Sequence, residues 1–239
     1  MRLDDPDVVR REYATEEGLR ARASVYEGVS GPDAREAAFE AVREAAPRDV
    51  LEVGCGWGES AARIASELGA RVVAVDLSPR MVELSRARGL DARLGDVQRL
   101  ELADASFDVA VANWMLYHVP DLDAALAELA RVLRPGGRLV AATNGIDHLG
   151  ELWALVRRDR RAEPVRFLAE TAEEPLRRHF ATVRRQDVVG AVTFRDRDAV
   201  RGYVASSVAH KHLAERVPEL DGPLVATRRN TIFVAETAP

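Results

Sequence analysis

The sequence predicts an α/β fold built around a mostly parallel sheet. From Asp49 to Thr143, short β-branched runs alternate with longer stretches of helical period, a pattern that is typical of βαβ units. The short runs are apolar at consecutive positions, as strands are when helices cover both faces of their sheet. They lie at 50–53, 71–75, 92–94, 107–112 and 138–143.

The stretches between these runs carry the signals that start and stop helices. Ser78 and Pro79 supply an N-cap and a proline at the first helical position, and Gly89 ends that helix. Asp121 can cap the next helix, in which leucines recur at every third or fourth position.

The two ends of the chain extend this pattern. Residues 7–46 predict two helical segments, and residues 144–180 predict a mostly helical insertion after the fifth strand. The β pattern returns at 188–194 and at 231–235, with a helix between them. Two closing strands after five parallel ones bring the expected total to seven.

Length and composition are those of an ordinary globular protein with one main domain. The 239 residues are 47% hydrophobic and 31% charged, with a formal net charge of −5. No apolar stretch approaches the roughly 18 residues of a membrane span, and the start of the chain lacks the apolar core of a signal peptide. Acidic residues interleave the arginine pairs, which disfavours a nucleic-acid partner. We therefore expect a cytoplasmic protein without a membrane partner, and a homodimer is compatible with the sequence.

One bend is unusually rich in glycine. Residues 51–58 read LEVGCGWG, and Gly54, Gly56 and Gly58 directly follow a short apolar run. Glycine inside an element costs roughly 0.5–1 kcal/mol relative to alanine, so three at one bend need a reason. The reason is either a tight strand-to-helix turn or a backbone that approaches a ligand closely. In an open α/β sheet, ligands bind beyond the carboxyl ends of the strands, where this bend lies.

Acidic residues follow two further strands. Asp76 follows the run RVVAV, and Asp96 follows ARLG. An acid at the end of the second strand is placed to accept hydrogen bonds from both ribose hydroxyls of a nucleoside. Asp96 would lie one strand further out, near an adenine amino group. A dinucleotide-binding dehydrogenase would also need glycines and such an acid, but its fingerprint is G-x-G-x-x-G, whereas this loop reads G-x-G-x-G.

Together these segments resemble the class I S-adenosylmethionine-dependent methyltransferases. The likeness covers residues 49–143 and is carried by LEVGCGWGES, VVAVDLSPRMVELSRARG, LGDVQRL, FDVAVANWMLYHVPD and LARVLRPGGRLVA. It implies a Rossmann-like, doubly wound sheet of seven mostly parallel strands, of which the last is antiparallel. It also implies that the chain divides into an N-terminal helical lid at 1–46 and a main domain at 47–239. The main domain would carry substrate-side insertions at about 144–180 and 196–228.

The resemblance also implies a cofactor and its site. The cofactor is S-adenosylmethionine, which leaves as S-adenosylhomocysteine, and no metal is expected. In the family the glycine loop passes under the ribose and the amino-acid part of the cofactor, the second-strand acid binds the ribose, and the third-strand acid faces adenine. Carried over to this chain, the cofactor-binding residues are Glu52, Gly54, Gly56, Gly58, Asp76, Leu77, Met81, Asp96, Val97 and Asn113. Leu77 and Met81 would flank adenine, and Asn113 would meet the methionine moiety.

Few residues are candidates for the chemistry itself. His118, just beyond the fourth strand, is the best-placed general base, with a loop-ordering role as the alternative. The N-terminal stretch resembles the variable lid of the family. There Arg22 would pair with the cofactor carboxylate and Tyr13 would shield the methyl centre, unless the stretch is a plain amphipathic cap. Cys55, the only cysteine, is expected to be a small buried filler.

The sequence therefore predicts a methyltransferase that acts on an O, N or C nucleophile of a small molecule. Two alternatives stay open: an RNA or protein methyltransferase, and a non-catalytic cofactor-binding subunit with a regulatory or partner role. The net charge of −5 counts against RNA, and the intact motifs count against a subunit without catalysis. The segments that would choose the acceptor resemble nothing that can be assigned.

Overall fold

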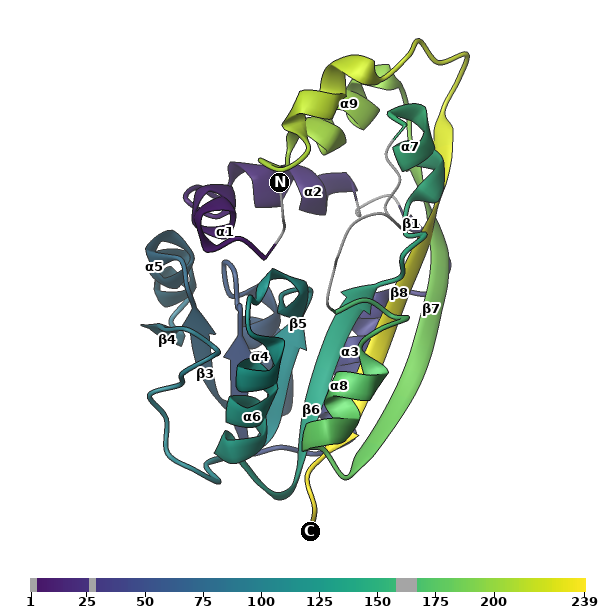
Figure 1. Cartoon of the computed structure of the whole chain (residues 1–239). Helices are drawn as coiled ribbons and strands as arrows, with labels where there is room; N and C mark the ends of the chain where they lie inside the picture. Colours follow the sequence, from purple (N-terminus) through teal and green to yellow (C-terminus); the bar gives the residue numbers. More distant parts are fainter. Residues whose placement is uncertain (1–3, 26–28, 158–166) are drawn as a thin grey trace.

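An eight-stranded sheet forms the centre of the protein in the computed structural model, which describes residues 4–25, 29–157 and 167–239 (Figure 1). Its strand order is β1-β7-β8-β6-β5-β2-β3-β4. The strands are β1 (Val29–Ser30), β2 (Asp49–Val53), β3 (Arg71–Asp76), β4 (Asp91–Leu94), β5 (Phe107–Asn113), β6 (Leu133–Asn144), β7 (Thr182–Phe194) and β8 (Leu224–Glu236). Parts of the expected lid (1–3 and 26–28) and of the expected insertion (158–166) lie outside the described residues.

The pairing of the strands confirms the predicted topology. From β4 to β6 each neighbouring pair is parallel. The last strand, β8, is antiparallel to both β6 and β7, as expected. The eighth strand is β1, which adds only two residues to the free edge of β7, at Val29↔Val192 and Ser30↔Ala191. So short a strand leaves no periodicity in the sequence, which explains why seven strands were predicted.

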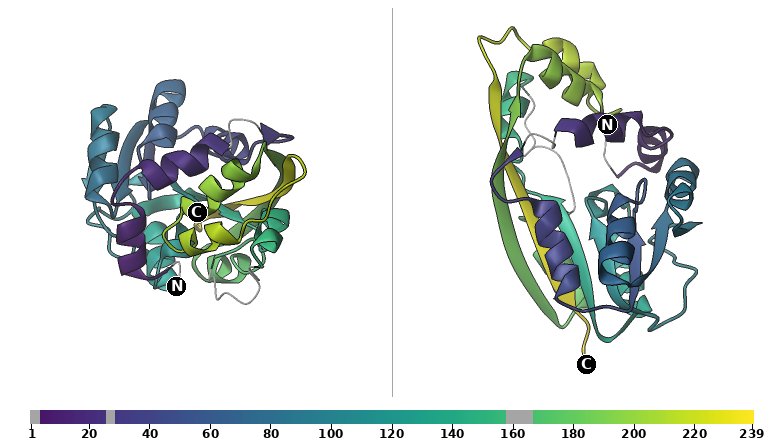
Figure 2. Two further views of the ribbon diagram at one scale, coloured as in Figure 1. Left: turned by 90° about the horizontal axis from the view of Figure 1, so that it is seen from above. Right: turned by 180° about the vertical axis from the view of Figure 1, so that it is seen from behind.

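Helices cover both faces of the sheet. The face formed by Val50, Val111 and Val140 packs against α3 (Ala34–Arg43), α4 (Glu59–Leu68) and Val82 of α5 (Pro79–Ala87). The opposite face packs against α6 (Leu122–Val132) and α8 (Glu173–His179). This two-sided cover explains why the central strands are apolar at consecutive positions. Figure 2 shows α3 in front of the sheet when the molecule is seen from behind.

A long β-ribbon rises from one side of the sheet. Strands β7 and β8 are 13 residues each and continue past the ends of the other strands (Figure 1). The extension carries α7 (Gly150–Leu155), α9 (Arg197–Ala205) and the 3₁₀ turn η4 (Lys211–Arg216). Their apolar residues form a separate cluster around Trp153 and Phe194. The described residues therefore form two apolar cores on the sheet and a third on the ribbon.

Two short helices lie over the carboxyl ends of the parallel strands, beneath α9 (Figure 1). They are α1 (Pro6–Glu12), capped by Asp5, and α2 (Glu17–Val25). We call these two helices the lid. The third helix of the N-terminal segment, α3, packs on the sheet and is not part of it. No helix among the described residues is long and apolar enough to cross a membrane.

Candidate active site

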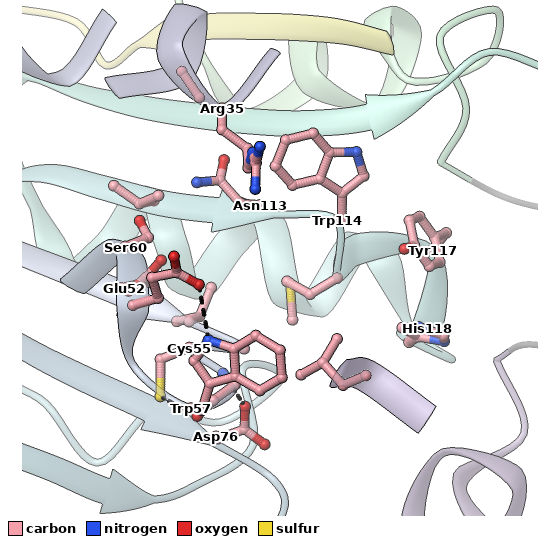
Figure 3. A pocket seen from close by; sticks show the side chains of 18 of the residues that line it. Arg35, Glu52, Cys55, Trp57, Ser60, Asp76, Asn113, Trp114, Tyr117 and His118 are labelled. Carbon is pink, nitrogen blue, oxygen red and sulfur yellow. Dashed lines mark hydrogen bonds between the residues drawn. The ribbon is translucent and has the colours of Figure 1, made fainter. Parts of the chain in front are cut away.

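A cavity of about 680 Å³ lies between the lid and the carboxyl ends of β2, β3 and β5. Its wall includes the glycine loop, the ends of the strands, the start of α3, and the side of the lid that faces the sheet (Figure 3). This volume is in the range of small-molecule sites. The position agrees with the rule that open α/β sheets bind ligands beyond their strand ends.

The glycine loop forms the floor of this cavity, and its glycines have different tasks. All three have positive φ, at +64° for Gly54, +56° for Gly56 and +79° for Gly58, which only glycine adopts at little cost. Gly54 and Gly56 line the cavity. Gly58 does not; it precedes α4, and a Cβ there would lie 2.6 Å from Leu90 and 2.7 Å from Ser85. Both sequence-based reasons for glycine therefore apply, at different positions.

Asp76 is fixed by the backbone around it. Its Oδ2 accepts a hydrogen bond from the N–H of Gly56 at 2.9 Å, and its Oδ1 accepts one from the N–H of Ser78 at 2.9 Å. Burial raises the pKa of Asp76, and these backbone donors oppose that rise. The carboxylate thus joins the glycine loop to the end of β3 at the cavity wall.

The residues expected near adenine are only partly brought together. Leu77, Asp96 and Val97 line the cavity beside Asp76. The carboxylate of Asp96 accepts hydrogen bonds from the N–H and the amide group of Gln98. Met81, by contrast, is fully buried and does not line the cavity. It belongs to the buried face of α5 and does not reach the cavity.

Two unsatisfied oxygens lie at the ends of β2 and β5. The carboxyl of Glu52 is 3% exposed, and burial raises its pKa to about 7. Oε2 of Glu52 and Oδ1 of Asn113 are buried and have no hydrogen-bond partner among the described residues. Both residues line the cavity. Unmade hydrogen bonds of buried groups are costly, so these two acceptors fit a ligand that carries N–H donors.

Tyr13 and His118 meet at the cavity although 105 residues separate them. Oη of Tyr13 lies 3.0 Å from Nε2 of His118. Burial raises the pKa of Tyr13 to about 12, so its phenol keeps its proton near neutral pH. The phenol can therefore donate to Nε2 when His118 carries its own proton on Nδ1. The structure thus brings together the two predicted catalytic residues.

Arg22 lines the cavity but is bound to protein groups. Its Nη1 forms an ion pair with Glu12 and donates to the backbone oxygen of Ser206 at 2.8 Å. Glu12 in turn accepts a hydrogen bond from the N–H of Val208 at 2.6 Å. The pair therefore ties the lid to the loop after α9, a role that the sequence analysis did not foresee.

Arg35 is a cavity residue that the sequence analysis missed. It stands in the first turn of α3, lines the cavity, and points toward Asn113 and Trp114 (Figure 3). An ion pair with Asp33, 2.9 Å between Nη2 and Oδ2, holds its guanidinium. In the sequence, the Asp-Ala-Arg order reads only as a helix start, so no local signal reveals its position.

The lid is also fastened on the side of β3 and α5. Oγ of Ser78 donates to the backbone oxygen of Tyr13 at 2.7 Å. Arg80 donates to both carboxylate oxygens of Glu16, each at 3.0 Å, which lowers the pKa of Glu16 to about 2. The lid thus closes over the cavity with contacts at both of its ends.

Cys55 has the environment of an inert filler. It is buried, and its Sγ lies 3.5 Å from Oγ of Ser85. Burial raises the pKa of the thiol to about 12, so the reactive thiolate is not populated near neutral pH. Nor do the described residues contain a group of three His, Cys, Asp or Glu side chains that could hold a metal ion.

Comparisons with known proteins agree with this geometry. Residues 51–141 match the model of a methyltransferase domain. The chain is 40% identical over 121 residues to methyltransferase GfsG of Streptomyces halstedii, which is 47% of this chain and 44% of that protein. It is 38% identical over 112 residues to malonyl-[acyl-carrier protein] O-methyltransferase of Serratia marcescens, 45% and 44% of the two chains. The matches thus span about half the length of these relatives.

Solved structures extend the likeness to the whole chain. An N-methyltransferase of Haemonchus contortus, in complex with phosphomonomethylethanolamine and S-adenosylhomocysteine, superposes with a TM-score of 0.65. The match covers 100% of this chain and 61% of that one, at 17% identity. Taken together, the glycine loop, the strand-end carboxylates and these comparisons show that residues 51–141 match a methyltransferase domain and that the chain has the fold of the class I S-adenosylmethionine-dependent methyltransferases.

Proposed function

We propose that the protein is an S-adenosylmethionine-dependent methyltransferase that acts on an O, N or C nucleophile of a small molecule. The observation that carries this proposal is the Asp76 carboxylate, which is held by the glycine loop at the wall of a cavity that also contains two unsatisfied buried acceptors. When bound, S-adenosylmethionine supplies a methyl group on a sulfonium centre, and the protein has only to position the nucleophile and exclude water.

The residues present fit this cofactor. Asp76 would accept hydrogen bonds from the ribose hydroxyls, and Leu77, Val97 and Asp96 would surround adenine. Oε2 of Glu52 and Oδ1 of Asn113 would accept from the ammonium of the amino-acid part, because each lacks a donor.

We assign the cofactor carboxylate to Arg35 in place of Arg22. Arg35 lies next to Asn113 in the cavity (Figure 3), whereas Arg22 pairs with the buried carboxylate of Glu12. Removing Arg22 from Glu12 would leave a buried charge without its partner, which is costly.

Tyr13 and His118 are the residues proposed to act on the acceptor. An acceptor hydroxyl or amine that displaces the Tyr13 phenol from Nε2 of His118 would deliver its proton to that nitrogen. The Tyr13 hydroxyl, protonated near neutral pH, would remain as a donor that orients the acceptor. The name of the relative from Serratia marcescens, an O-methyltransferase, favours oxygen among the three nucleophiles.

Calorimetry with S-adenosylhomocysteine tests the proposal. We expect the wild type to bind it and the isosteric variant Asp76→Asn to bind it at least about tenfold more weakly, because a charged acceptor is worth roughly 1.5–3 kcal/mol. Asp91→Asn, which changes an exposed acid at the start of β4, is the matched control. Binding of NAD without binding of S-adenosylhomocysteine would exclude the proposed cofactor.

A further inference from the structure

A row of polar side chains crosses the sheet at the edge of the cavity. On the face that packs against α3, strands β5, β6 and β8 carry apolar residues up to Val111, Ala142 and Ile232. Two positions further toward the cavity, the same face carries Asn113, Asn144 and Asn230, and Asn144 pairs directly with Asn230 in the sheet. Glu52 begins this row on β2, and Arg228 ends it on β8. We call these five residues the polar row.

The middle of the polar row is satisfied internally. Oδ1 of Asn144 accepts hydrogen bonds from Nε1 of Trp114 at 3.2 Å and from Nδ2 of Asn230 at 2.8 Å. These bonds fix the amides of β6 and β8 in one orientation. Groups with unmade hydrogen bonds remain toward its two ends: the acceptors of Glu52 and Asn113 at one end, and Arg228 at the other.

Arg228 is a buried cation whose hydrogen bonds are incomplete. Its side chain lines the cavity and is 3% exposed. Nη2 donates to the backbone oxygen of Pro32 at 2.9 Å, whereas Nε is buried and has no partner among the described residues. A buried guanidinium is expensive unless its charge and its donors are matched, so the free N–H calls for an acceptor.

The surroundings of Arg228 hold its guanidinium and neutralise its charge only in part. Gly190 of β7 pairs with Arg228 in the sheet and leaves space for its guanidinium. A Cβ at position 190 would lie only 2.7 Å from Nη2 of Arg228. The nearby carboxylate of Asp33 accepts hydrogen bonds from Arg35. Burial of Asp33 raises its pKa, but the hydrogen bonds from Arg35 and the charge of Arg228 outweigh this effect, so the pKa of Asp33 is lowered. One carboxylate thus lies near two arginines, which leaves a net positive charge that favours an anion, and Nε of Arg228 still lacks an acceptor among the described residues.

The cofactor does not account for this cation. Its single carboxylate is assigned to Arg35, and its ammonium to the Glu52 end of the polar row. From β2 to β8 the row spans three strand spacings, or roughly 14 Å at about 4.8 Å per strand. Arg228 therefore lies at the opposite end of the row from the proposed ammonium site, and Asp33 lies near both Arg228 and Arg35.

We infer that Arg228 binds an anionic group of the methyl acceptor, a carboxylate or a phosphate. The planar guanidinium suits both groups, because its N–H donors match two oxygens of one anion. The inference rests on the proposed function and adds the class of acceptor: a small molecule that carries an anion several bonds from its nucleophile.

Calorimetry on the full chain, saturated with S-adenosylhomocysteine, tests the inference. Benzoate and phenyl phosphate serve as anionic probes, and benzamide serves as the neutral probe of nearly the same shape as benzoate. We expect at least one anion to bind about tenfold or more tightly than benzamide, as a charge-assisted hydrogen bond in a buried site should allow. The tighter of the two anions identifies the group.

Variants of Arg228 assign the preference to this residue. Arg228→Met should abolish the preference, and Arg228→Lys, which keeps the charge and is the safer variant for folding, should weaken it severalfold. The matched control is Arg229→Met, which changes the next, exposed arginine of β8 and should leave the preference intact.

The outcomes separate this inference from the proposed function. A wild type that binds S-adenosylhomocysteine but binds benzoate, phenyl phosphate and benzamide equally would overturn the anion site and leave the methyltransferase proposal standing. An unchanged preference in both Arg228 variants would overturn it as well. A loss of affinity for S-adenosylhomocysteine in folded Arg228→Lys would show that Arg228 serves the cofactor. A wild type without affinity for S-adenosylhomocysteine would instead remove the proposed function.

Discussion

Glu52 and Asp76 end neighbouring strands, yet the fold treats their carboxyl groups differently. Burial raises the pKa of Asp76, but two backbone N–H groups donate to its carboxylate and oppose that rise by favouring the charged form. Glu52 is nearly fully buried, and its pKa rises to about 7. Near neutral pH a small change in surroundings therefore decides whether Glu52 is charged, and a ligand ammonium would favour the charged form.

This difference predicts how stability depends on pH. A folded pKa near 7 against 4.5 in the unfolded chain means that the folded state binds more protons between these values. Stability then falls as pH rises through this window and is level above it. The variant Glu52→Gln lacks this loss, so its stability relative to the wild type should improve by about 2–3 kcal/mol from pH 5 to pH 8. Urea unfolding of both proteins at pH 5 and pH 8 measures this change in the free energy of unfolding. If the variant and the wild type differ by the same free energy at both pH values, Glu52 is not the cause of the pH dependence.

The contact between Tyr13 and His118 predicts an energetic coupling. A hydrogen bond between neutral groups contributes about 0.5–1.5 kcal/mol to stability, so Tyr13→Phe and His118→Ala should each destabilise the protein. The double variant should lose less than the sum by about that amount. Urea unfolding of the four proteins gives the cycle. Strict additivity would mean that the contact contributes nothing to the closed lid.

Several site residues could be found from the sequence because each has a local signal. Asp76 follows a strand, and the glycine spacing marks the loop. Arg228 has no such signal: it alternates with Asn230 and Ile232 along β8, which shows a common face but not what the face meets. The place of Arg228 in the cavity depends on the neighbouring strands and on Pro32, which lies nearly 200 residues earlier in the sequence.

At the scale of elements, the lid differs most from what the sequence indicates. Residues 7–25 carry few apolar side chains among many charges, so they read as a loosely held cap. The structure holds them with polar contacts: Glu12 with Arg22 and the loop after α9, and Glu16 with Arg80. Such pairs join residues far apart in the sequence, and periodicity cannot reveal them. Four strands of the parallel core, whose signals are local, were predicted to within one residue of their observed bounds, whereas β6 begins at Leu133, five residues before its predicted start.

The lid contacts predict the effect of one substitution. Glu12→Gln leaves Arg22 partly buried without its counter-charge, and breaking a buried pair in this way costs about 3–5 kcal/mol. Amides of α1 and α2 should then exchange hydrogen much faster, while those of β2 and β5 stay protected. Hydrogen exchange followed by mass spectrometry measures both. Glu17→Gln, which changes an exposed acid at the start of α2, should exchange like the wild type.

If the Glu12 variant keeps wild-type exchange throughout the lid, the apolar contacts, such as that of buried Val8, hold the lid closed and the ion pair does not.

At the scale of the whole molecule, the separate cluster on the ribbon predicts a separate step of opening. The residues around Trp153 pack on the extension of β7 and β8 and not on the main sheet. Cooperative units of this kind open at their own free energy. In native-state hydrogen exchange at rising urea, amides of α9 should open at lower denaturant than those of β5 and β6. A single common opening would show that the lid couples the ribbon fully to the sheet.

The place of β8 has a consequence for how the protein is made. This strand comes last among the strands of the sheet in chain order, yet it lies between β6 and β7 and pairs with both along their length. Until residues 224–236 emerge, the nascent chain holds two long unpaired strand edges, each a template for pairing with other chains. Synthesis of residues 224–236 therefore closes these edges and also brings Arg228 and Asn230 to the cavity, so a chain stalled before β8 would be prone to aggregation and without a complete site.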